Sequence, residues 1–175
     1  MQAIQTVTVG SGGAASIEFA SIPDTFTDLK LVTSVRMNTT DFSTNNVLVE
    51  INGSSANLTT RRLLGNGSSA LSFSGSLGYI LEAPSSTATA NTFNNGSAYF
   101  PNYAGSTNKS YSGDSVTENN ATLAVQLLVA GLWNQTAAIT SLTLKSETSV
   151  DFLEHSTATL YGILAGSDGT TTVTT

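Results

Sequence analysis

Apolar and polar residues alternate along most of this chain, which is the pattern of strands with one buried face. The clearest example covers residues 28–37, where Leu29, Leu31 and Val35 fall on one face and Lys30 on the other. Apolar residues at helical spacing are nearly absent. The same alternation predicts further strands over residues 4–9, 15–20, 47–51, 57–64, 71–81, 98–100, 139–145 and 157–164.

Residues 122–133 break the alternation because they are almost continuously apolar. Such a run is typical of a central strand that is covered on both faces. Trp133 ends it, and packing in or at the rim of the core is the expected role of its ring. Between two other strands, Asn52-Gly53 predicts a tight hairpin turn, since both central positions of a type I′ turn need positive φ.

Three stretches consist mainly of small polar residues. Residues 84–97 and 104–120 are predicted as flexible loops, and 166–175 as a polar C-terminal tail. Loops of this length are commonly binding elements or become ordered by a neighbour. With eight to ten short strands, the chain is expected to form a single all-β domain over residues 1–175, an antiparallel β-sandwich of jelly-roll type.

Charged side chains are scarce, at 10% of 175 residues, and the formal net charge is −6. An acidic chain lacks the basic face that phosphates require, so no nucleic-acid partner is expected. No apolar run approaches the length of a membrane span, and the N-terminus lacks the features of a signal peptide. Six basic residues and three prolines offer little protection to edge strands, which predicts that other copies or partners cover them.

The sequence indicates no catalytic or metal site. His155 is the one histidine, cysteine is absent, and a zinc site or a catalytic triad would need more. Two local groups of oxygen ligands, Asp24 with Asp28 and Asp41 with Asn45 and Asn46, are better explained as turn residues than as calcium ligands. We therefore expect no enzyme and no cofactor, although two of the twelve acidic residues could still meet in space as in a glycoside hydrolase.

Five residues are candidate contact positions. Ile4 and Val7 lie on the first predicted strand, which could pair with another protein. Tyr99, Tyr103 and Tyr111 lie in or beside predicted loops, so their rings are candidates for exposed aromatic contacts to a glycan. The alternative is that these tyrosines cover the sheet edges.

Four segments resemble those of virion structural proteins from tailed bacteriophages, especially aquatic and cyanophage-type phages. They are Ile22-Pro23-Asp24-Thr25-Phe26-Thr27-Asp28-Leu29-Lys30-Leu31-Val32, then residues 49–53 ending in Asn-Gly, the Arg-Arg-Leu-x-Gly-Asn-Gly-Ser-Ser element at 61–69, and residues 156–163. The resemblance covers the first 70 residues and the C-terminal strand, and it is patchy between them.

The resemblance implies a virion component that assembles in the host cytoplasm. A capsid decoration or cement protein is the leading interpretation, with the major capsid protein as its partner and a homotrimer as its form. Such a protein would stabilise the head by bridging capsid subunits. The alternative is a tail or head-fibre module that binds host surface glycans.

Overall fold

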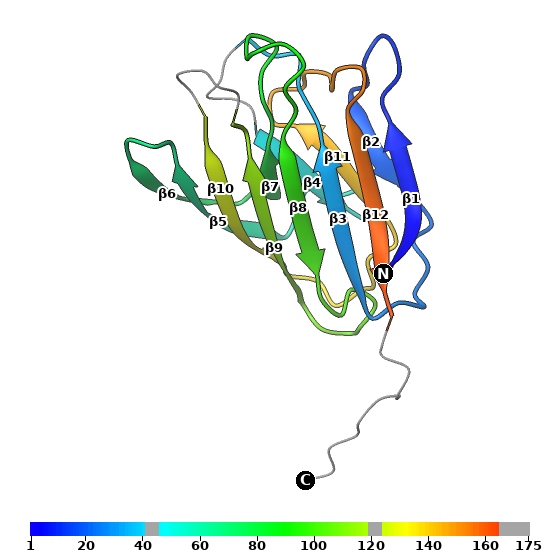
Figure 1. Cartoon of the computed structure of the whole chain (residues 1–175). Coiled ribbons are helices and arrows are strands. Elements are labelled where there is room, and N and C mark those ends of the chain that lie inside the picture. The colour runs from blue at the N-terminus through cyan, green and yellow to red at the C-terminus, as the bar shows by residue number, and fades with distance from the viewer. Residues whose placement is uncertain (41–45, 119–123, 165–175) are drawn as a thin grey trace.

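The computed structural model describes residues 1–40, 46–118 and 124–164, and the regular elements in these ranges are all strands (Figure 1). There are twelve, which exceeds the eight to ten expected because residues 71–81 and 104–120 hold more strands than the pattern resolves. They are β1 Gln2–Thr8, β2 Ser16–Phe19, β3 Asp28–Ser34, β4 Asn46–Ile51, β5 Leu58–Gly65, β6 Ala70–Gly75, β7 Tyr79–Glu82, β8 Asn95–Phe100, β9 Lys109–Val116, β10 Gln126–Trp133, β11 Leu142–Ser146 and β12 Thr157–Ile163.

The strands form two antiparallel sheets that pack face to face. The larger has eight strands in the order β1-β12-β3-β8-β9-β10-β5-β6, and the smaller has four in the order β2-β11-β4-β7. The predicted antiparallel sandwich is therefore confirmed, whereas its jelly-roll form stays a prediction. Because the sheets differ in width, the β5–β6 hairpin extends beyond the smaller sheet (Figure 1), and β6 is largely exposed.

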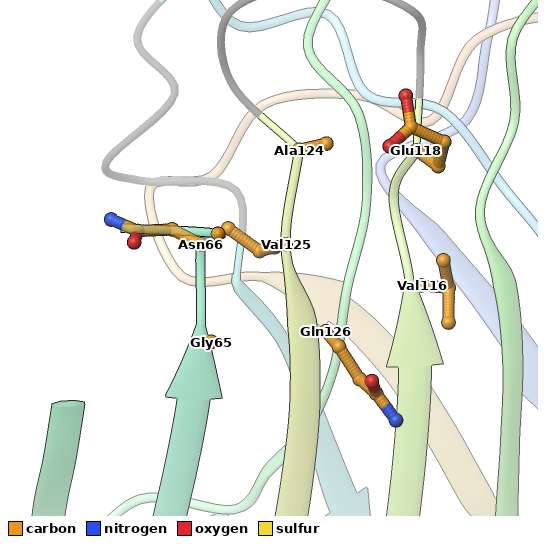
Figure 2. Close-up of a pocket in the computed structure, with 8 residues that line it drawn as sticks. Gly65, Asn66, Val116, Glu118, Ala124, Val125 and Gln126 are labelled. Carbon is orange, nitrogen blue, oxygen red and sulfur yellow. The ribbon is translucent and has the colours of Figure 1, made fainter. Parts of the chain in front are cut away.

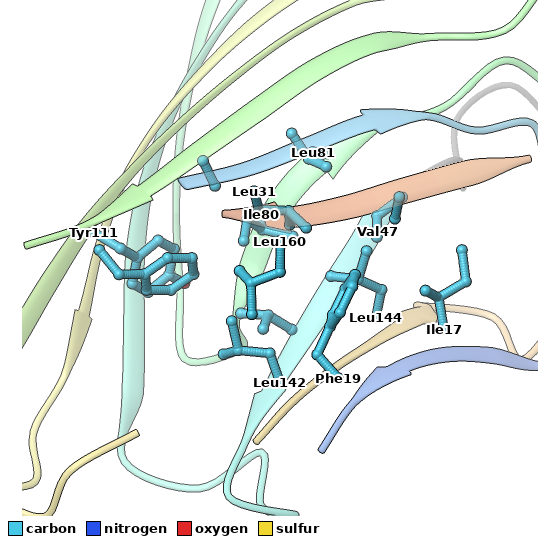
Figure 3. Packing of buried hydrophobic residues seen from close by; sticks show 14 of the residues in the cluster. Ile17, Phe19, Leu31, Val47, Ile80, Leu81, Tyr111, Leu142, Leu144 and Leu160 are labelled. Atoms are coloured by element: carbon cyan, nitrogen blue, oxygen red, sulfur yellow. The ribbon is translucent and has the colours of Figure 1, made fainter. Parts of the chain in front are cut away.

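The core lies between the sheets and is built by alternate residues of the strands. Leu31 of β3 and Leu160 of β12 enter it from the larger sheet, and Leu142 and Leu144 of β11 meet them from the smaller one (Figure 3). Leu29 of β3 is buried in the same core. Trp133 is also buried, as its place at the end of an apolar run predicts. Period-two alternation thus locates the inner face of both sheets.

The prediction of a loop over residues 104–120 is wrong, because β9 occupies the middle of that stretch. β9 is a central strand paired with β8 and β10. Its inner face carries Tyr111, Gly113 and Ser115, and a Cβ on Gly113 would lie 2.4 Å from the carbonyl oxygen of Ile80. Small residues are needed there because another strand passes close by, and the same small residues give the sequence its loop-like composition.

The loop predicted over residues 84–97 is shorter than expected, because residues 95–97 belong to β8. The remaining part is tied to the buried side chain of Arg36. Its guanidinium donates hydrogen bonds of 2.8–3.1 Å to four backbone carbonyls, those of Ser86, Ala88, Thr89 and Thr92. The loop is thus ordered from within the chain rather than by a neighbour.

A second buried cation orders the segments at the opposite end of the larger sheet. The Lys109 ammonium is almost fully buried and donates to the carbonyl oxygens of Gly105, Thr107, Thr136 and Ala137, at 2.5–3.3 Å. Burial lowers the pKa of this amine below its ordinary value. Four aligned carbonyl dipoles offset the cost of burying the charge.

The tight turn predicted at Asn52-Gly53 is confirmed, but the hairpin is not, because β4 lies in the smaller sheet and β5 in the larger one, so the two strands do not pair. Both residues have positive φ, 53° and 72°, and they connect β4 to the turn before β5. The Asn52 side chain accepts hydrogen bonds from the backbone of Thr140 and Ser141, which fixes the turn against the residues just before β11. The predicted tail over residues 166–175 lies outside the described residues.

Candidate binding face

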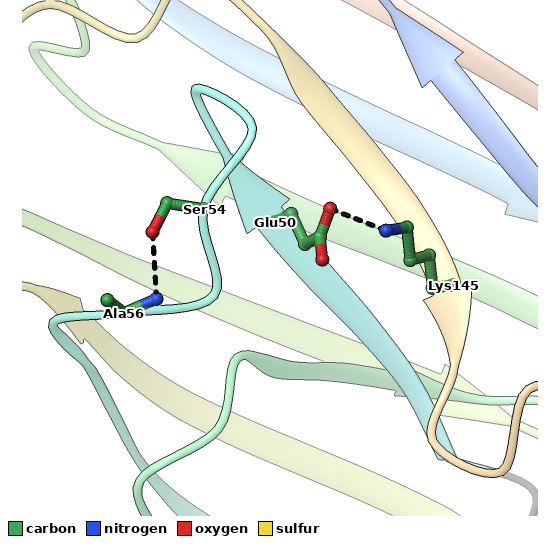
Figure 4. Close-up of polar contacts among 4 residues, drawn as sticks. All are labelled: Glu50, Ser54, Ala56 and Lys145. Carbon is green, nitrogen blue, oxygen red and sulfur yellow. Dashed lines mark hydrogen bonds and ion pairs between the residues drawn. The ribbon is translucent and has the colours of Figure 1, made fainter.

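The two sheets present different outer faces. The outer face of the smaller sheet is charged: Glu50 of β4 and Lys145 of β11 form an ion pair of 2.8 Å close to the turn that holds Ser54 (Figure 4). Such a face suits contact with water. The outer face of the larger sheet instead carries several exposed aliphatic side chains, concentrated on β5 and β10.

The expectation that residues 122–133 form a strand covered on both faces is wrong in one respect. β10 is central in its sheet, between β9 and β5, but its exposure alternates strictly. Leu127 and Val129 point into the core, whereas Leu128 is 47% exposed and Leu132 38% exposed. Nothing in the described chain covers that second apolar face.

The register joins these side chains to a neighbour on β5. Leu63 is 50% exposed and pairs directly with Leu128, so the two are adjacent across the strands. Together with Ala130 and Leu132 they form what we call the apolar seam, comprising Leu63, Leu128, Ala130 and Leu132. Three adjacent hollows of about 410, 210 and 280 Å³ lie along it. Single exposed apolar residues are ordinary, but a contiguous patch marks an interaction surface.

Opposite charges flank the apolar seam. Arg61 of β5 is exposed on one side, opposite Ala130 in register. Asp114 of β9 is exposed on the other side, opposite Leu128. Asp114 is held by a ladder across three strands, since Lys30 donates to the Ser97 hydroxyl at 2.8 Å and that hydroxyl donates to Asp114 at 2.7 Å.

The chain has six lysine and arginine residues, and all six lie in the described ranges. Arg61 differs from the other five in its contacts. Its guanidinium donates to the carbonyl of the preceding Thr60, a purely local contact. The other five are engaged by groups elsewhere in the fold: Lys30 by Ser97, Arg36 by the β7–β8 loop, Arg62 by Asn46, Lys109 by four carbonyls and Lys145 by Glu50.

The β5–β6 hairpin, which contributes Leu63 to the apolar seam, is braced from its inner side. The Arg62 guanidinium lies 3.5 Å from the centre of the Tyr79 ring and 5.2 Å from that of Phe73. It also donates to Asn46 at 2.8 Å, and Tyr79 donates to Glu147 at 2.6 Å. These contacts hold the hairpin to the edge of the smaller sheet, so the seam is presented on a supported surface.

The residues proposed from the sequence do not come together. Ile4 and Val7 lie on β1, at the opposite edge of the larger sheet from the apolar seam, and both are half-buried against the core. The strand itself is an edge strand of its sheet, as an interface role requires. Their role as contact residues stays a prediction.

The three tyrosines are less exposed than expected. Tyr103 is buried and donates to the carbonyl of Pro23, and Tyr111 is buried, stacked on Phe100 with ring centres 5.3 Å apart. The expectation of exposed rings is wrong for both, because each ring is part of the buried hydrophobic core. Tyr99 is half-buried, and its hydroxyl donates to Asp28 at 2.7 Å, a hydrogen bond that raises the pKa of the phenol.

A further hollow of about 540 Å³ lies at the end of β5, β9 and β10 (Figure 2). Its lining includes Asn66, Glu118 and Gln126 with small and apolar residues, and Glu118 is the one ionisable side chain among these lining residues. Within residues 1–40, 46–118 and 124–164, no group of three or more His, Cys, Asp or Glu side chains is placed to hold a metal ion.

The remaining polar candidates have structural roles where they are described. Asp28 begins β3, and its oxygens accept from the hydroxyl of Tyr99 on β8 and from the backbone of Asn102 in the turn after β8. Asp41 and Asn45 lie outside the described residues. His155 lies in a turn with positive φ, and the neighbouring Ser156 hydroxyl is buried against the backbone of Arg36.

Comparisons of the chain with family models, with curated proteins and with solved structures give no match. Among the described residues, none belongs to a helix with the length and apolar character needed to cross a membrane.

Proposed function

We propose that this chain is a structural protein of a tailed-phage virion, and specifically a capsid decoration protein that stabilises the head by bridging capsid subunits. The observation that carries the proposal is the apolar seam, an uncovered aliphatic surface on a rigid sheet. A surface of this kind gains free energy when another protein covers it, at roughly 25 cal/mol per Å² of apolar area.

The resemblance supports the same proposal. The element at residues 61–69 resembles a segment of phage virion proteins, and it supplies both Arg61 and Leu63 of the face. Residues 156–163, which carry another part of the resemblance, form β12 beside the edge strand β1. Ile4 and Val7 on that edge remain the proposed positions of contact with the major capsid protein, and the homotrimer stays a prediction.

The alternative, a fibre module that binds host glycans, has less support. It required several exposed aromatic rings, and of the three tyrosines proposed only Tyr99 is partly accessible. That ring is engaged by Asp28 through its hydroxyl. Stacking on a sugar needs an open ring face, so one half-buried tyrosine is a poor platform.

The test is a head-binding experiment. Purified chain is added to phage heads that lack it, and the rupture temperature of the heads is followed by light scattering. We expect saturable binding and a higher rupture temperature, because a ligand that binds only the closed shell stabilises it by mass action. Leu128→Ser should weaken the effect, while Val32→Ser, a change of a similarly exposed residue on β3 of the same outer face, should not.

Two results would refute the proposal. In one, the chain fails to bind heads at any concentration and their rupture temperature does not change. In the other, it binds host cells or releases sugar from host polysaccharide, which would favour the fibre module or a hydrolase.

A further inference from the structure

The apolar seam has a positive charge on one side and a negative charge on the other, an arrangement that the proposed function alone does not require. The seam runs along β10 and β5, with a cation on β5 and an anion on β9. These two strands are the immediate neighbours of β10, one on each side. A surface with opposite charges on the two sides of an apolar strip can complement its own copy.

We infer that the occupant of the apolar seam is a second copy of this chain, packed face to face about a twofold axis that runs parallel to β10. This inference rests on the proposed function, since it names the partner of the same face. Such an axis places β5 of one copy over β9 of the other. Arg61 then faces Asp114 of the second copy, and the contact occurs twice.

The strand register makes this contact feasible. Arg61 is level with Ala130 and Asp114 is level with Leu128, so the two charges are two residues apart along the strands. Two residues correspond to about 7 Å, and packed sheets lie about 10 Å apart, distances that a long arginine side chain on one sheet can span toward a carboxylate on the other. Meanwhile Leu63, Leu128 and Leu132 of both copies leave water together.

Charge also selects this axis over the other simple arrangement. A twofold axis in the interface but perpendicular to the strands would place β5 over β5, and Arg61 would then approach the Arg61 of the second copy. Like charges in a contact are unfavourable, whereas opposite charges fix register and orientation. Asp114 is well suited to this role because Ser97 and Lys30 already hold its carboxylate in place.

The inferred contact differs from the homotrimer expected from the sequence, because a closed twofold contact pairs chains. Its hydrophobic part resembles the packing of two sheets in a β-sandwich. The four-stranded sheet covers only the inner face of the eight-stranded sheet. The second copy would cover the outer face of the eight-stranded sheet over β9, β10 and β5. The capsid contact would then be made by the edge strand β1, which this pairing leaves open, and Leu128→Ser would weaken head binding by removing the second copy.

Sedimentation velocity of the full chain tests the inference across about 1–100 µM, the range in which a micromolar dimer dissociates. We expect a species of twice the 18.0 kDa chain mass. Arg61→Glu and Asp114→Arg, each alone, should raise the dissociation constant at least about tenfold, since each places like charges together. Combined in one chain they should restore dimerisation, because the exchanged charges again meet across the axis.

Leu128→Ser should also give monomers, while Val32→Ser keeps the dimer and serves as the matched control. Circular dichroism of each variant shows whether the fold is retained. The inference is overturned by a monomeric wild-type chain throughout the range, by a mass of three chains, or by a double charge variant no better than the single ones. Head binding is measured separately, so a dimer that ignores heads would refute the proposed function and leave this inference standing.

Discussion

Glu82 is the most informative residue for a test of the packing, because it is an acid placed in the core. It ends β7, at the edge of the smaller sheet, and is only 4% exposed. One of its carboxylate oxygens, Oε2, has no hydrogen-bond partner among the described residues. Burial disfavours the charged form and raises the pKa of Glu82 from 4.5 to about 7, although the nearby Arg62 lowers it in part.

The size of the effect follows from the shift. A pKa difference of one unit between folded and unfolded chain corresponds to 1.36 kcal/mol, so the rise to about 7 corresponds to about 3 kcal/mol. The folded state holds the proton more tightly than the unfolded state. The associated stability is therefore fully present below pH 4.5, decreases as pH rises, and is lost above about pH 7. Glu82→Gln keeps the shape but cannot ionise, so it should remove this pH dependence.

Urea unfolding at pH 5, 6, 7 and 8 measures the effect. The wild-type chain should lose about 2.5 kcal/mol more than Glu82→Gln between the two ends of this range, because a small part of the effect is already lost at pH 5. Glu154→Gln, the same change at an exposed position, should follow the wild-type profile. Comparing slopes cancels the contributions of other titrating groups. Equal slopes for wild type and Glu82→Gln would mean that Glu82 is ionised in the folded chain at pH 5, and the reasoning from burial would be refuted.

Three further substitutions test other parts of the structure. Lys109→Met should lower the free energy of unfolding by about 1–3 kcal/mol because it leaves buried carbonyls unpaired. Lys145→Met, which breaks an exposed ion pair, should lower it by less than about 1 kcal/mol. Urea titrations of both variants check this, and equal losses would contradict the prediction. Arg36→Met should speed amide hydrogen exchange in residues 86–92, measured by mass spectrometry, and unchanged exchange there would show that the loop does not depend on the guanidinium. Gly131→Ala should cost about 1–3 kcal/mol because its Cβ would lie 2.0 Å from the Tyr111 ring, while Gly10→Ala meets nothing within 4 Å and should be nearly neutral in a thermal melt.

Much of the fold could be predicted from the sequence because alternation is a local signal. A strand such as β3 buries Leu29 and Leu31 on one face and keeps Val32 on the other, so the pattern can be recognised without knowing any neighbour. The turn at Asn52-Gly53 is equally local, since two adjacent residues there adopt positive φ. Features of this kind need no information from distant parts of the chain.

β9 could not be recognised because its composition is set by distant strands. Gly113 is small since the Ile80 backbone passes over it, and Ser115 is small and bonded to the backbone of Glu82. Neither contact is visible within the segment itself. The loops were misjudged for a related reason, because Arg36 and Lys109 hold carbonyls that are many residues away.

The candidate face was missed because an apolar run does not say how many of its faces are covered. In β10 both sets of alternate residues are apolar, and burial on both sides is the ordinary interpretation of such a run. The four-stranded sheet packs only on the inner face of the eight-stranded sheet. Leu128 and Leu132 lie on the outer face of the eight-stranded sheet, and nothing within the described chain covers them. The apolar run therefore indicates that β10 has two apolar faces, but only one of them is covered within the described chain, and the second copy inferred above would cover the other. The same logic applies to charge: five of six cations are used inside the fold, and the one left over, Arg61, lies at the border of this uncovered surface.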